Sequence, residues 1–282
     1  MIVESSPDRV RKQVREARRA GRHIGVVPTM GALHEGHVSL MEAACRDGMF
    51  TVATIFVNPA QFGPGEDFDR YPRTPDDDLA RCMTAGADLV FTPETGAMYL
   101  PDAATTVTVS GLTDVLEGAL RPGHFDGVTT IVAKLFHITE PDRAYFGQKD
   151  YQQQLIIRRM VRDLNFGLEV VTCPTVREPD GLAMSSRNRY LTPDERRRAL
   201  ILHRALLLAE TLAADSTHSP ASIERRMKDL MTAEPGVSVD YAVVADRETL
   251  QPLSVRPAAA VALIAARVGA TRLIDNGILQ FR

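Results

Sequence analysis

Residues 25–40 read GVVPTMGALHEGHVSL, a stretch that joins an apolar run to a helix-like segment through a glycine-containing loop. The run IGVVPT (24–29) is short and rich in β-branched residues, whereas HVSLMEAACRDG (37–48) has helical spacing of its apolar residues. A strand, a loop and a helix in this order are the repeating unit of parallel α/β sheets. His34 and His37 therefore stand where a strand gives way to a helix.

The same alternation continues through the first 175 residues. Further strand-like runs are TVATIFV (51–57), DLVFTP (88–93), RAYFG (143–147) and LEVVTCP (168–174), and helix-like runs include PDDDLARCMTAGA (75–87) and DYQQQLIIRRMVRDLN (150–165). The apolar runs barely alternate with polar residues, as expected for parallel strands that are covered on both faces. The pattern predicts a Rossmann-like, doubly wound α/β sheet, which binds ligands at the carboxyl ends of its strands.

The pattern changes after about residue 176. A long helix is predicted over 192–214, with Thr192 as N-cap, Pro193 at the first helical position and Glu195 completing a capping box. A second helix near 220–233 and three strand-like runs follow, VSVDYAVVAD (237–246), AAVALIAARV (259–268) and TRLIDNGIL (271–279). We therefore expect two domains, a Rossmann-like domain of residues 1–176 and a smaller α+β domain of residues 177–282 with an antiparallel sheet.

Composition excludes several classes of protein. The 282 residues are 44% apolar and 24% charged with a net charge of −3, which argues against broad attraction to nucleic acid. The basic stretch at 8–22 has a narrow apolar stripe of Val10, Val14 and Ala17, and this is typical of a solvated amphipathic helix. The three cysteines are far apart, and no run has the length of a signal peptide core or a membrane span. We expect a soluble cytoplasmic protein with neither nucleic-acid nor membrane partners.

The loop GALHEGH (31–37) fits none of three common motifs. The zincin motif requires histidines four apart, whereas His34 and His37 are three apart. The two glycines have P-loop spacing, but His37 and Val38 stand where Lys and Ser or Thr are needed, and no GxGxxG is present.

A helix start with free N–H groups and a positive dipole end remains, and such a helix start suits an anion. Gly36 would let a nucleotide lie against the backbone, and His34 and His37 could donate to phosphate oxygens. The alternative is that the two histidines cap the loop without binding any ligand.

Two further segments have local interpretations. Thr74 as N-cap, Pro75 and Asp77 as capping-box partner predict that the acidic run 76–78 serves helix-start electrostatics. The segment between Gln61 and Thr74 contains glycines and a proline with little periodicity, so we interpret it as a mobile lid.

The stretch PTMGALHEGH (28–37) resembles the HxGH signature of the nucleotidyltransferase superfamily, which class I aminoacyl-tRNA synthetases share. More narrowly it is similar to the pantoate–β-alanine ligase family. Four further stretches resemble that family in the same order: IFVNPAQFGPGEDFDRYPRTPDDDL (55–79), LRPGHFDGV (120–128), AYFGQKDYQQ (144–153) and MSSRNRYL (184–191). The resemblance implies ATP-dependent condensation of pantoate with β-alanine through a pantoyl-adenylate, with Mg²⁺ as cofactor and a homodimer as the assembly.

The resemblance also implies the site residues. ATP would be bound by Met30, Gly31, Ala32, Leu33, His34, Glu35, Gly36, His37, Gly147, Gln148, Lys149, Asp150, Val176, Met184, Ser185, Ser186 and Arg187. Among these, His34, His37, Lys149 and Arg187 would be catalytic. Pantoate and β-alanine would be bound by Gln61, Gln153, Asn58 and Arg121. The Mg²⁺ ligands stay unassigned.

The chemistry of these side chains leaves some roles open. His37 would protonate or stabilise the departing diphosphate. Asp150 could hold a ribose hydroxyl, assist Mg²⁺ or cap a helix. Arg121 and His124 could bind a carboxylate, although a loop ion pair explains them equally well.

Two other functions compete with the ligase. Another HxGH nucleotidyltransferase is the first, but a tRNA enzyme would need a substantial basic surface and usually an anticodon-binding domain. A non-catalytic nucleotide-binding protein is the second, and it would need the loops but not the paired cationic and imidazole donors.

Overall fold

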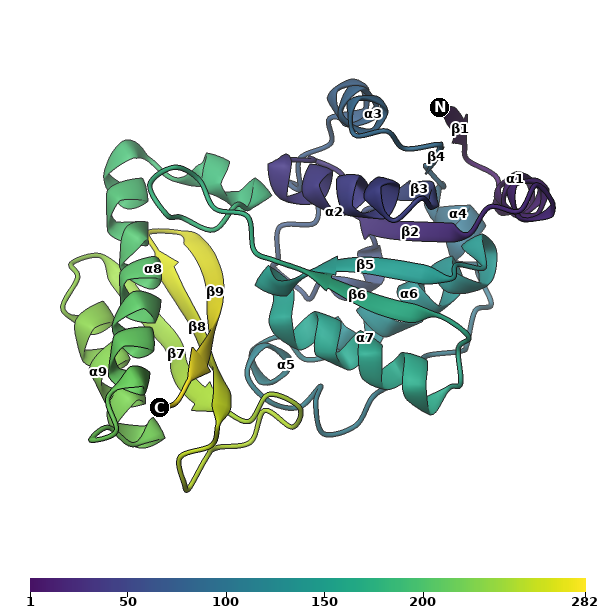
Figure 1. Cartoon of the computed structure of the whole chain (residues 1–282). Coiled ribbons are helices and arrows are strands. Elements are labelled where there is room, and N and C mark those ends of the chain that lie inside the picture. Colours follow the sequence, from purple (N-terminus) through teal and green to yellow (C-terminus); the bar gives the residue numbers. More distant parts are fainter. The chain divides into compact units, whose positions relative to one another are not determined.

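The computed structural model describes residues 1–282, and the chain divides into two compact units, residues 1–174 and 175–282 (Figure 1).

Unit 1 contains a six-stranded parallel sheet in the order β1-β4-β3-β2-β5-β6. The strands are β1 (Ile2–Glu4), β2 (Ile24–Thr29), β3 (Phe50–Ile55), β4 (Leu89–Phe91), β5 (Arg143–Gly147) and β6 (Glu169–Cys173). The helices are α1 (Pro7–Arg19), α2 (Glu35–Arg46), α3 (Pro75–Thr84), α4 (Thr95–Met98), α5 (Glu117–Leu120), α6 (His124–Thr139) and α7 (Tyr151–Asp163), with 3₁₀ turns η1 (Pro59–Gln61) and η2 (Gln148–Asp150).

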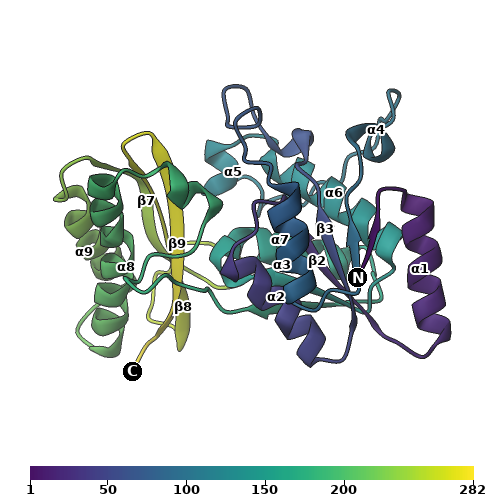
Figure 2. The ribbon, with the colours of Figure 1, turned by 90° about the horizontal axis from the view of Figure 1, so that it is seen from above.

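The chain reverses its direction across the sheet between β2 and β5. From β2 it passes to β3 and then β4 on one side, and it returns to β5 on the other side of β2. The connecting helices accordingly cover opposite faces, with α2 on one face and α6 and α7 on the other (Figures 1 and 2). The carboxyl ends of β2 and β5 thus flank a topological switch point, where doubly wound sheets bind their ligands.

Burial explains the apolar character of the strands. Val26, Val27, Val52 and Val90 are fully buried, because helices cover both faces of the sheet. Helix α1 shows the predicted amphipathic pattern, since Val10 and Val14 are buried while its arginines remain in solvent. The predicted doubly wound sheet is confirmed.

Unit 2 is the predicted smaller α+β fold. It contains η3 (Ser186–Tyr190), α8 (Pro193–Ala214), α9 (Pro220–Thr232) and an antiparallel sheet of β7 (Val237–Ala245), β8 (Ala259–Val268) and β9 (Thr271–Gln280). The predicted capping box is present: Thr192 Oγ1 accepts from the Glu195 N–H, and the Glu195 carboxylate accepts from the Thr192 N–H at 2.8 Å.

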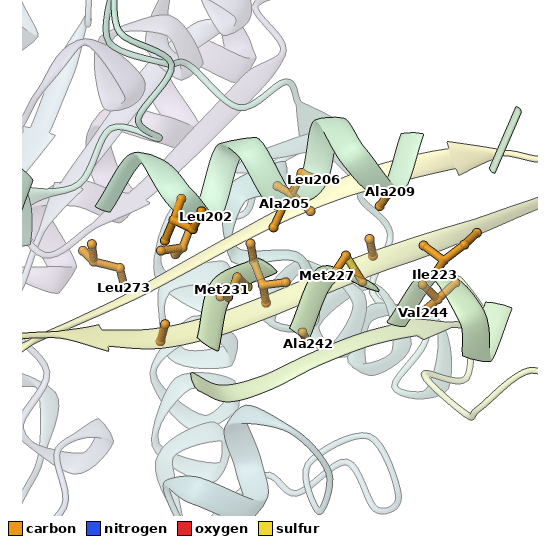
Figure 3. Close-up of a cluster of buried hydrophobic side chains, with 14 of the residues drawn as sticks. Leu202, Ala205, Leu206, Ala209, Ile223, Met227, Met231, Ala242, Val244 and Leu273 are labelled. Carbon is orange, nitrogen blue, oxygen red and sulfur yellow. The ribbon is translucent and has the colours of Figure 1, made fainter. Parts of the chain in front are cut away.

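The two long helices of unit 2 pack on one face of its sheet. Leu202 and Leu206 of α8 and Met227 of α9 lie over Val244 and Leu273 of the strands (Figure 3). This cluster forms a core separate from that of unit 1. None of the helices in the chain combines the length and the apolar character needed to cross a membrane.

Candidate active site

The loop that follows β2 is held in an unusual backbone conformation. The Thr29 hydroxyl at the strand end donates to Thr54 O at 2.7 Å and accepts from the Gly31 N–H at 3.2 Å. Gly31 and Ala32 then adopt left-handed conformations with φ of +80° and +50°. Left-handed backbone at a residue with a Cβ is uncommon and persists where surrounding contacts enforce it.

Asp78 of α3 provides those contacts. Its carboxylate accepts from the N–H groups of Ala32 at 3.0 Å and Leu33 at 2.7 Å, and its side chain is almost fully buried. The Thr74 hydroxyl donates to the same carboxylate at 3.2 Å.

This arrangement corrects our interpretation of the acidic run 76–78. Thr74 occupies the N-cap position but its side chain caps no backbone N–H, so the predicted capping box with Asp77 is absent. Asp76 and Asp77 are exposed at the start of the helix, as helix-start electrostatics requires. Asp78 has a different role, because it binds the backbone of a loop remote in sequence.

His34 and His37 form a reciprocal capping box at the start of α2. The Gly36 N–H donates to His34 Nδ1 and the His34 N–H donates to His37 Nδ1, both at 3.2 Å. The two rings lie with centroids 4.1 Å apart. The expectation that this helix start has free N–H groups is therefore wrong for these two amides, which the imidazoles satisfy.

The capping bonds determine the tautomer of both rings. A nitrogen that accepts a hydrogen bond carries no proton, so each neutral ring must be protonated at Nε2. Burial, followed by the neighbouring His34 and Lys149, lowers the pKa of His37 well below its ordinary value. His37 is thus a neutral Nε2–H donor at pH 7, which favours stabilisation of a developing charge over protonation of it.

Lys149 and Asp150 lie in η2, directly after β5. The Lys149 ammonium is 3.7 Å from Asp150 Oδ1 and close enough to His37 to lower its pKa. Asp150 occupies the N-cap position of α7 but makes no side-chain capping bond, so the capping alternative is wrong for this residue. The structure thus brings the histidine loop and the segment 147–150 together at the switch point.

Asn58 and Gln61 are joined to each other. Asn58 Nδ2 donates to Gln61 Oε1 at 3.1 Å and to Gly127 O at 3.0 Å, while its Oδ1 accepts from the Ala60 N–H and the Tyr99 hydroxyl. These four bonds use the full capacity of the Asn58 amide. Asn58 therefore positions Gln61 and has no further donor or acceptor for a substrate.

The backbone around this pair is packed against α6. A Cβ at Gly127 would overlap the carbonyl group of Ala60, so only glycine permits this approach. Gln61 Nε2 also donates to the Met30 sulfur at 2.8 Å, which links this corner to the histidine loop.

Arg121 and His124 form a cluster with Glu66 of the predicted lid. The Arg121 guanidinium donates to both Glu66 carboxylate oxygens, at 2.7 and 2.6 Å. His124 Nδ1 donates to Gln61 O at 2.7 Å, and burial together with Arg121 lowers the pKa of His124 to about 4. The loop ion pair is therefore made, and the binding of a substrate carboxylate by Arg121 stays a prediction.

The three successive glutamines of α7 differ in their surroundings. Gln152 is buried, donates to Leu112 O and Val115 O, and accepts from the Glu117 N–H. Gln154 is also buried and accepts from the Thr172 hydroxyl. Gln153 alone is partly exposed, as a ligand-binding residue must be.

The predicted ATP-binding residues of unit 2 form a single turn. The Met184 N–H donates to Val176 O at 3.0 Å, and Ser185 Oγ accepts from the Arg187 N–H at 3.3 Å as the N-cap of η3, which contains Ser186.

Residues that we did not predict anchor this turn. Arg177 forms a bidentate ion pair with the buried Asp275 of β9, and Asn188 donates to Glu178 at 2.7 Å and to Ala183 O at 3.0 Å. Asn188 lies within the stretch 184–191, so its place next to the serines of that motif is the feature of the sequence that could have identified it.

Known proteins resemble the chain over nearly its whole length. The family model described as Pantoate-beta-alanine ligase matches residues 2–278. Pantothenate synthetase of Moorella thermoacetica is 55% identical over 271 residues, 96% of either chain. The crystal structure of pantothenate synthetase from Thermus thermophilus has a TM-score of 0.91 at 49% identity and covers 98% of this chain and 99% of its own. Pantoate-beta-alanine ligase from Francisella tularensis, complexed with beta-gamma ATP and beta-alanine, has a TM-score of 0.80 at 31% identity, covering 99% and 97%.

Proposed function

The chain belongs to the pantoate-beta-alanine ligase family, and we propose that the residues at the β2–β5 switch point bind the triphosphate of its ATP. The reaction is the ATP-dependent condensation of pantoate with β-alanine, which forms a carbon–nitrogen bond and yields pantothenate, AMP and diphosphate. The pantoate carboxylate attacks the α-phosphorus, diphosphate leaves, and the amine of β-alanine displaces AMP from the pantoyl-adenylate.

The juxtaposition of His34, His37 and Lys149 carries this proposal. Both the attacking carboxylate and the triphosphate are anionic, so catalysis requires positioning and neutralisation of charge. The Nε2–H groups of the two histidines donate to phosphate oxygens, and the Lys149 ammonium supplies positive charge. Met30, Gly31, Glu35 and Gly36 line the nucleotide from the loop, and Gly147, Gln148 and Asp150 line it from the η2 side.

The backbone N–H groups of Ala32 and Leu33 take no part in phosphate binding, because Asp78 already occupies them. These two residues contribute only the shape of the loop. In unit 2, Val176, Met184, Ser185, Ser186 and Arg187 offer two hydroxyls and a guanidinium, which suit the β- and γ-phosphates of ATP.

Pantoate has two hydroxyls and one carboxylate, so neutral amides suit it. Gln61 Oε1 is held by Asn58 and one N–H of Gln61 Nε2 donates to the Met30 sulfur, so the second N–H of Nε2 is the group we assign to the substrate. Gln153 supplies a second amide that can donate and accept. Arg121 binds a carboxylate when the Glu66 ion pair opens.

Mg²⁺ accompanies ATP in this proposal. The chain has no cluster of three or more His, Cys, Asp or Glu side chains suited to hold a metal ion. Mg²⁺ typically keeps waters and binds substrate phosphates with one or two carboxylates, and the half-exposed Asp150 beside Lys149 fits that need. When bound, the ion would neutralise charge on the phosphates. We further place the enzyme in the cytoplasm as a homodimer, a state that light scattering tests directly.

The decisive experiment follows oxygen-18 from the carboxylate of labelled pantoate. Transfer of one label into AMP, with formation of pantothenate, supports the pantoyl-adenylate route. Exchange of labelled diphosphate into ATP is the companion measurement. Exchange that requires a different acid would support another nucleotidyltransferase, and ATP binding without exchange with any acid would support a non-catalytic nucleotide-binding protein.

A further inference from the structure

Asp78 is a buried carboxylate whose charge is compensated by N–H and O–H groups rather than by a cation. Its side chain is 1% exposed, and its partners are the Ala32 N–H, the Leu33 N–H and the Thr74 hydroxyl. An ionised carboxylate is stable in such a place only when several donors satisfy it. The Asp78 carboxylate therefore binds the loop directly to α3, beside the exposed ion pair of Arg81 with Glu35.

The two backbone donors form an anion-binding concavity of their own. Successive N–H groups in turn conformations converge on an anion, in the manner of a nest. The left-handed Gly31 and Ala32 place the N–H groups of Ala32 and Leu33 in that arrangement. A side chain of the protein fills this nest, on the strand side of the loop that we propose for phosphate binding.

Gly31 shows how closely the carboxylate approaches the loop. A Cβ at this position would lie 2.9 Å from Asp78 Oδ2 and 3.1 Å from Ile55 Cγ2. Such contacts leave no space for a side chain between the loop and α3. The loop is bonded to Asp78 at Ala32 and Leu33 and to the histidine capping box at its far end.

We propose that Asp78 is a positioning residue that fixes residues 31–34 so that the Nε2–H groups of His34 and His37 face the triphosphate. The inference rests on the proposed function of this loop. Asp78 acts through the loop and does not touch the nucleotide.

An electrostatic role and a positioning role of Asp78 predict opposite changes in ATP binding when its charge is removed. A negative charge behind a phosphate-binding loop repels ATP, so its removal alone would tighten ATP binding. Asparagine keeps one acceptor oxygen but sets an NH2 group against the second loop N–H, which would instead let the loop move and would weaken ATP binding and turnover. The sign of the change therefore separates a positioning role from a purely electrostatic one.

The test compares Asp78→Asn with Asp76→Asn in the full-length enzyme. Both substitutions remove one negative charge from the first turn of α3, but Asp76 is exposed and lies outside the site. In Asp78→Asn, kcat/KM for ATP should fall about 10- to 100-fold, as expected for loss of a charge-assisted hydrogen bond, with KM for β-alanine within about twofold. Hydrogen exchange in the peptide spanning residues 31–37 should become faster in Asp78→Asn only.

A milder variant keeps the test valid if Asp78→Asn does not fold. Thr74→Val removes the hydroxyl that orients the carboxylate and should lower kcat/KM for ATP about threefold, in the same direction. Unchanged or tighter ATP use in Asp78→Asn, or in Thr74→Val as substitute, overturns the inference. If the wild-type enzyme shows no pantoate-dependent exchange, the proposed function fails instead, and hydrogen exchange still reports whether Asp78 holds the loop.

Discussion

The side-chain amide of Asn58 donates to Gln61 Oε1 at 3.1 Å, and this bond fixes the orientation of the Gln61 amide, whose Nε2 points the other way and donates to the Met30 sulfur. Asn58 itself is held by the Tyr99 hydroxyl at 2.8 Å. Burial raises the pKa of Tyr99, so this hydroxyl remains protonated and a donor at neutral pH. Tyr99, Asn58 and Gln61 thus form a chain of hydrogen bonds that ends at the residue we propose for pantoate binding.

Tyr99→Phe should raise KM for pantoate about fivefold, because one neutral hydrogen bond that orients Asn58 is lost. KM for ATP should stay within about twofold of the wild-type value, since the Tyr99 hydroxyl donates to Asn58 and not to the histidine loop. Steady-state kinetics with each substrate varied in turn measures both constants. An equal rise in all KM values would mean that Tyr99 supports the fold in general and not Gln61 in particular.

The neutral state of His37 has a consequence for substitutions at that position. His37→Ala should lower kcat roughly 100- to 1000-fold with little change in substrate affinity, as for the loss of one donor to a developing oxyanion. His37→Gln restores an N–H near the Nε2 position and should recover part of that loss. The two variants are compared by the single-turnover rate of adenylate formation. An equal loss of rate in His37→Ala and His37→Gln would indicate that His37 transfers a proton. An unchanged rate of adenylate formation in His37→Ala would show that His37 has no role in the reaction.

His124 makes stability depend on pH. Burial and Arg121 lower the pKa of His124 to about 4, whereas in the unfolded chain its pKa is the ordinary 6.5. Below pH 6.5 His124 is protonated in the unfolded chain but stays neutral in the folded chain. Its contribution to stability is therefore fully present above pH 6.5 and is lost as the pH drops toward 4. At pH 5 this loss amounts to roughly 2 kcal/mol.

Urea unfolding of the wild type and of His124→Gln at pH 7 and pH 5 measures the contribution of His124 to the free energy of unfolding. Between pH 7 and pH 5 the free energy of unfolding should fall by roughly 2 kcal/mol more in the wild type than in the variant. His37 and the other histidines are present in both proteins and contribute equally. An equal loss in both proteins would show that His124 is not neutral in the folded state.

The Glu66–Arg121 ion pair ties the predicted lid to the rest of unit 1. Glu66→Gln weakens this bidentate contact and should loosen residues 62–73, which lets water reach the adenylate. The ratio of AMP released to pantothenate formed should then rise above the wild-type value. Asp69→Asn is the matched control, since Asp69 is exposed in the same segment. A ratio that stays at the wild-type value in Glu66→Gln would argue against a lid that excludes water. Replacement of the glycines in this segment should slow turnover while ATP binding is retained.

Local patterns predicted most elements but failed where an element lacks a local signature. The strand β5 and the capping box of Thr192 and Glu195 appear as expected, because period and capping chemistry act between near neighbours. Helix α6 was not predicted, since nearly all of it is buried and only a narrow stripe of Asp126, Lys134 and His137 marks its helical period. Strand β1 is three residues long at the edge of the sheet, too short for a periodic signal.

The candidate site shows the same division. His34, His37, Lys149 and Gln61 were predicted because a motif contains each of them, and the structure brings the first three together at the switch point. The role of Asp78 could not be predicted, because its partners Ala32 and Leu33 lie 46 and 45 residues away and an aspartate at a helix start already has a local explanation.

The sequence by itself determined the parallel sheet, the two types of domain and the family, because these depend on periodicity and on short motifs. Only the tertiary structure decided which donors and acceptors remain for ligands. It placed Asp78 on the loop amides, Asn58 on Gln61 and Glu66 on Arg121. The physical reason is that a hydrogen bond between residues distant in the chain depends on which elements pack against each other, and the local spacing of residues shows that a face is buried but not against which partner.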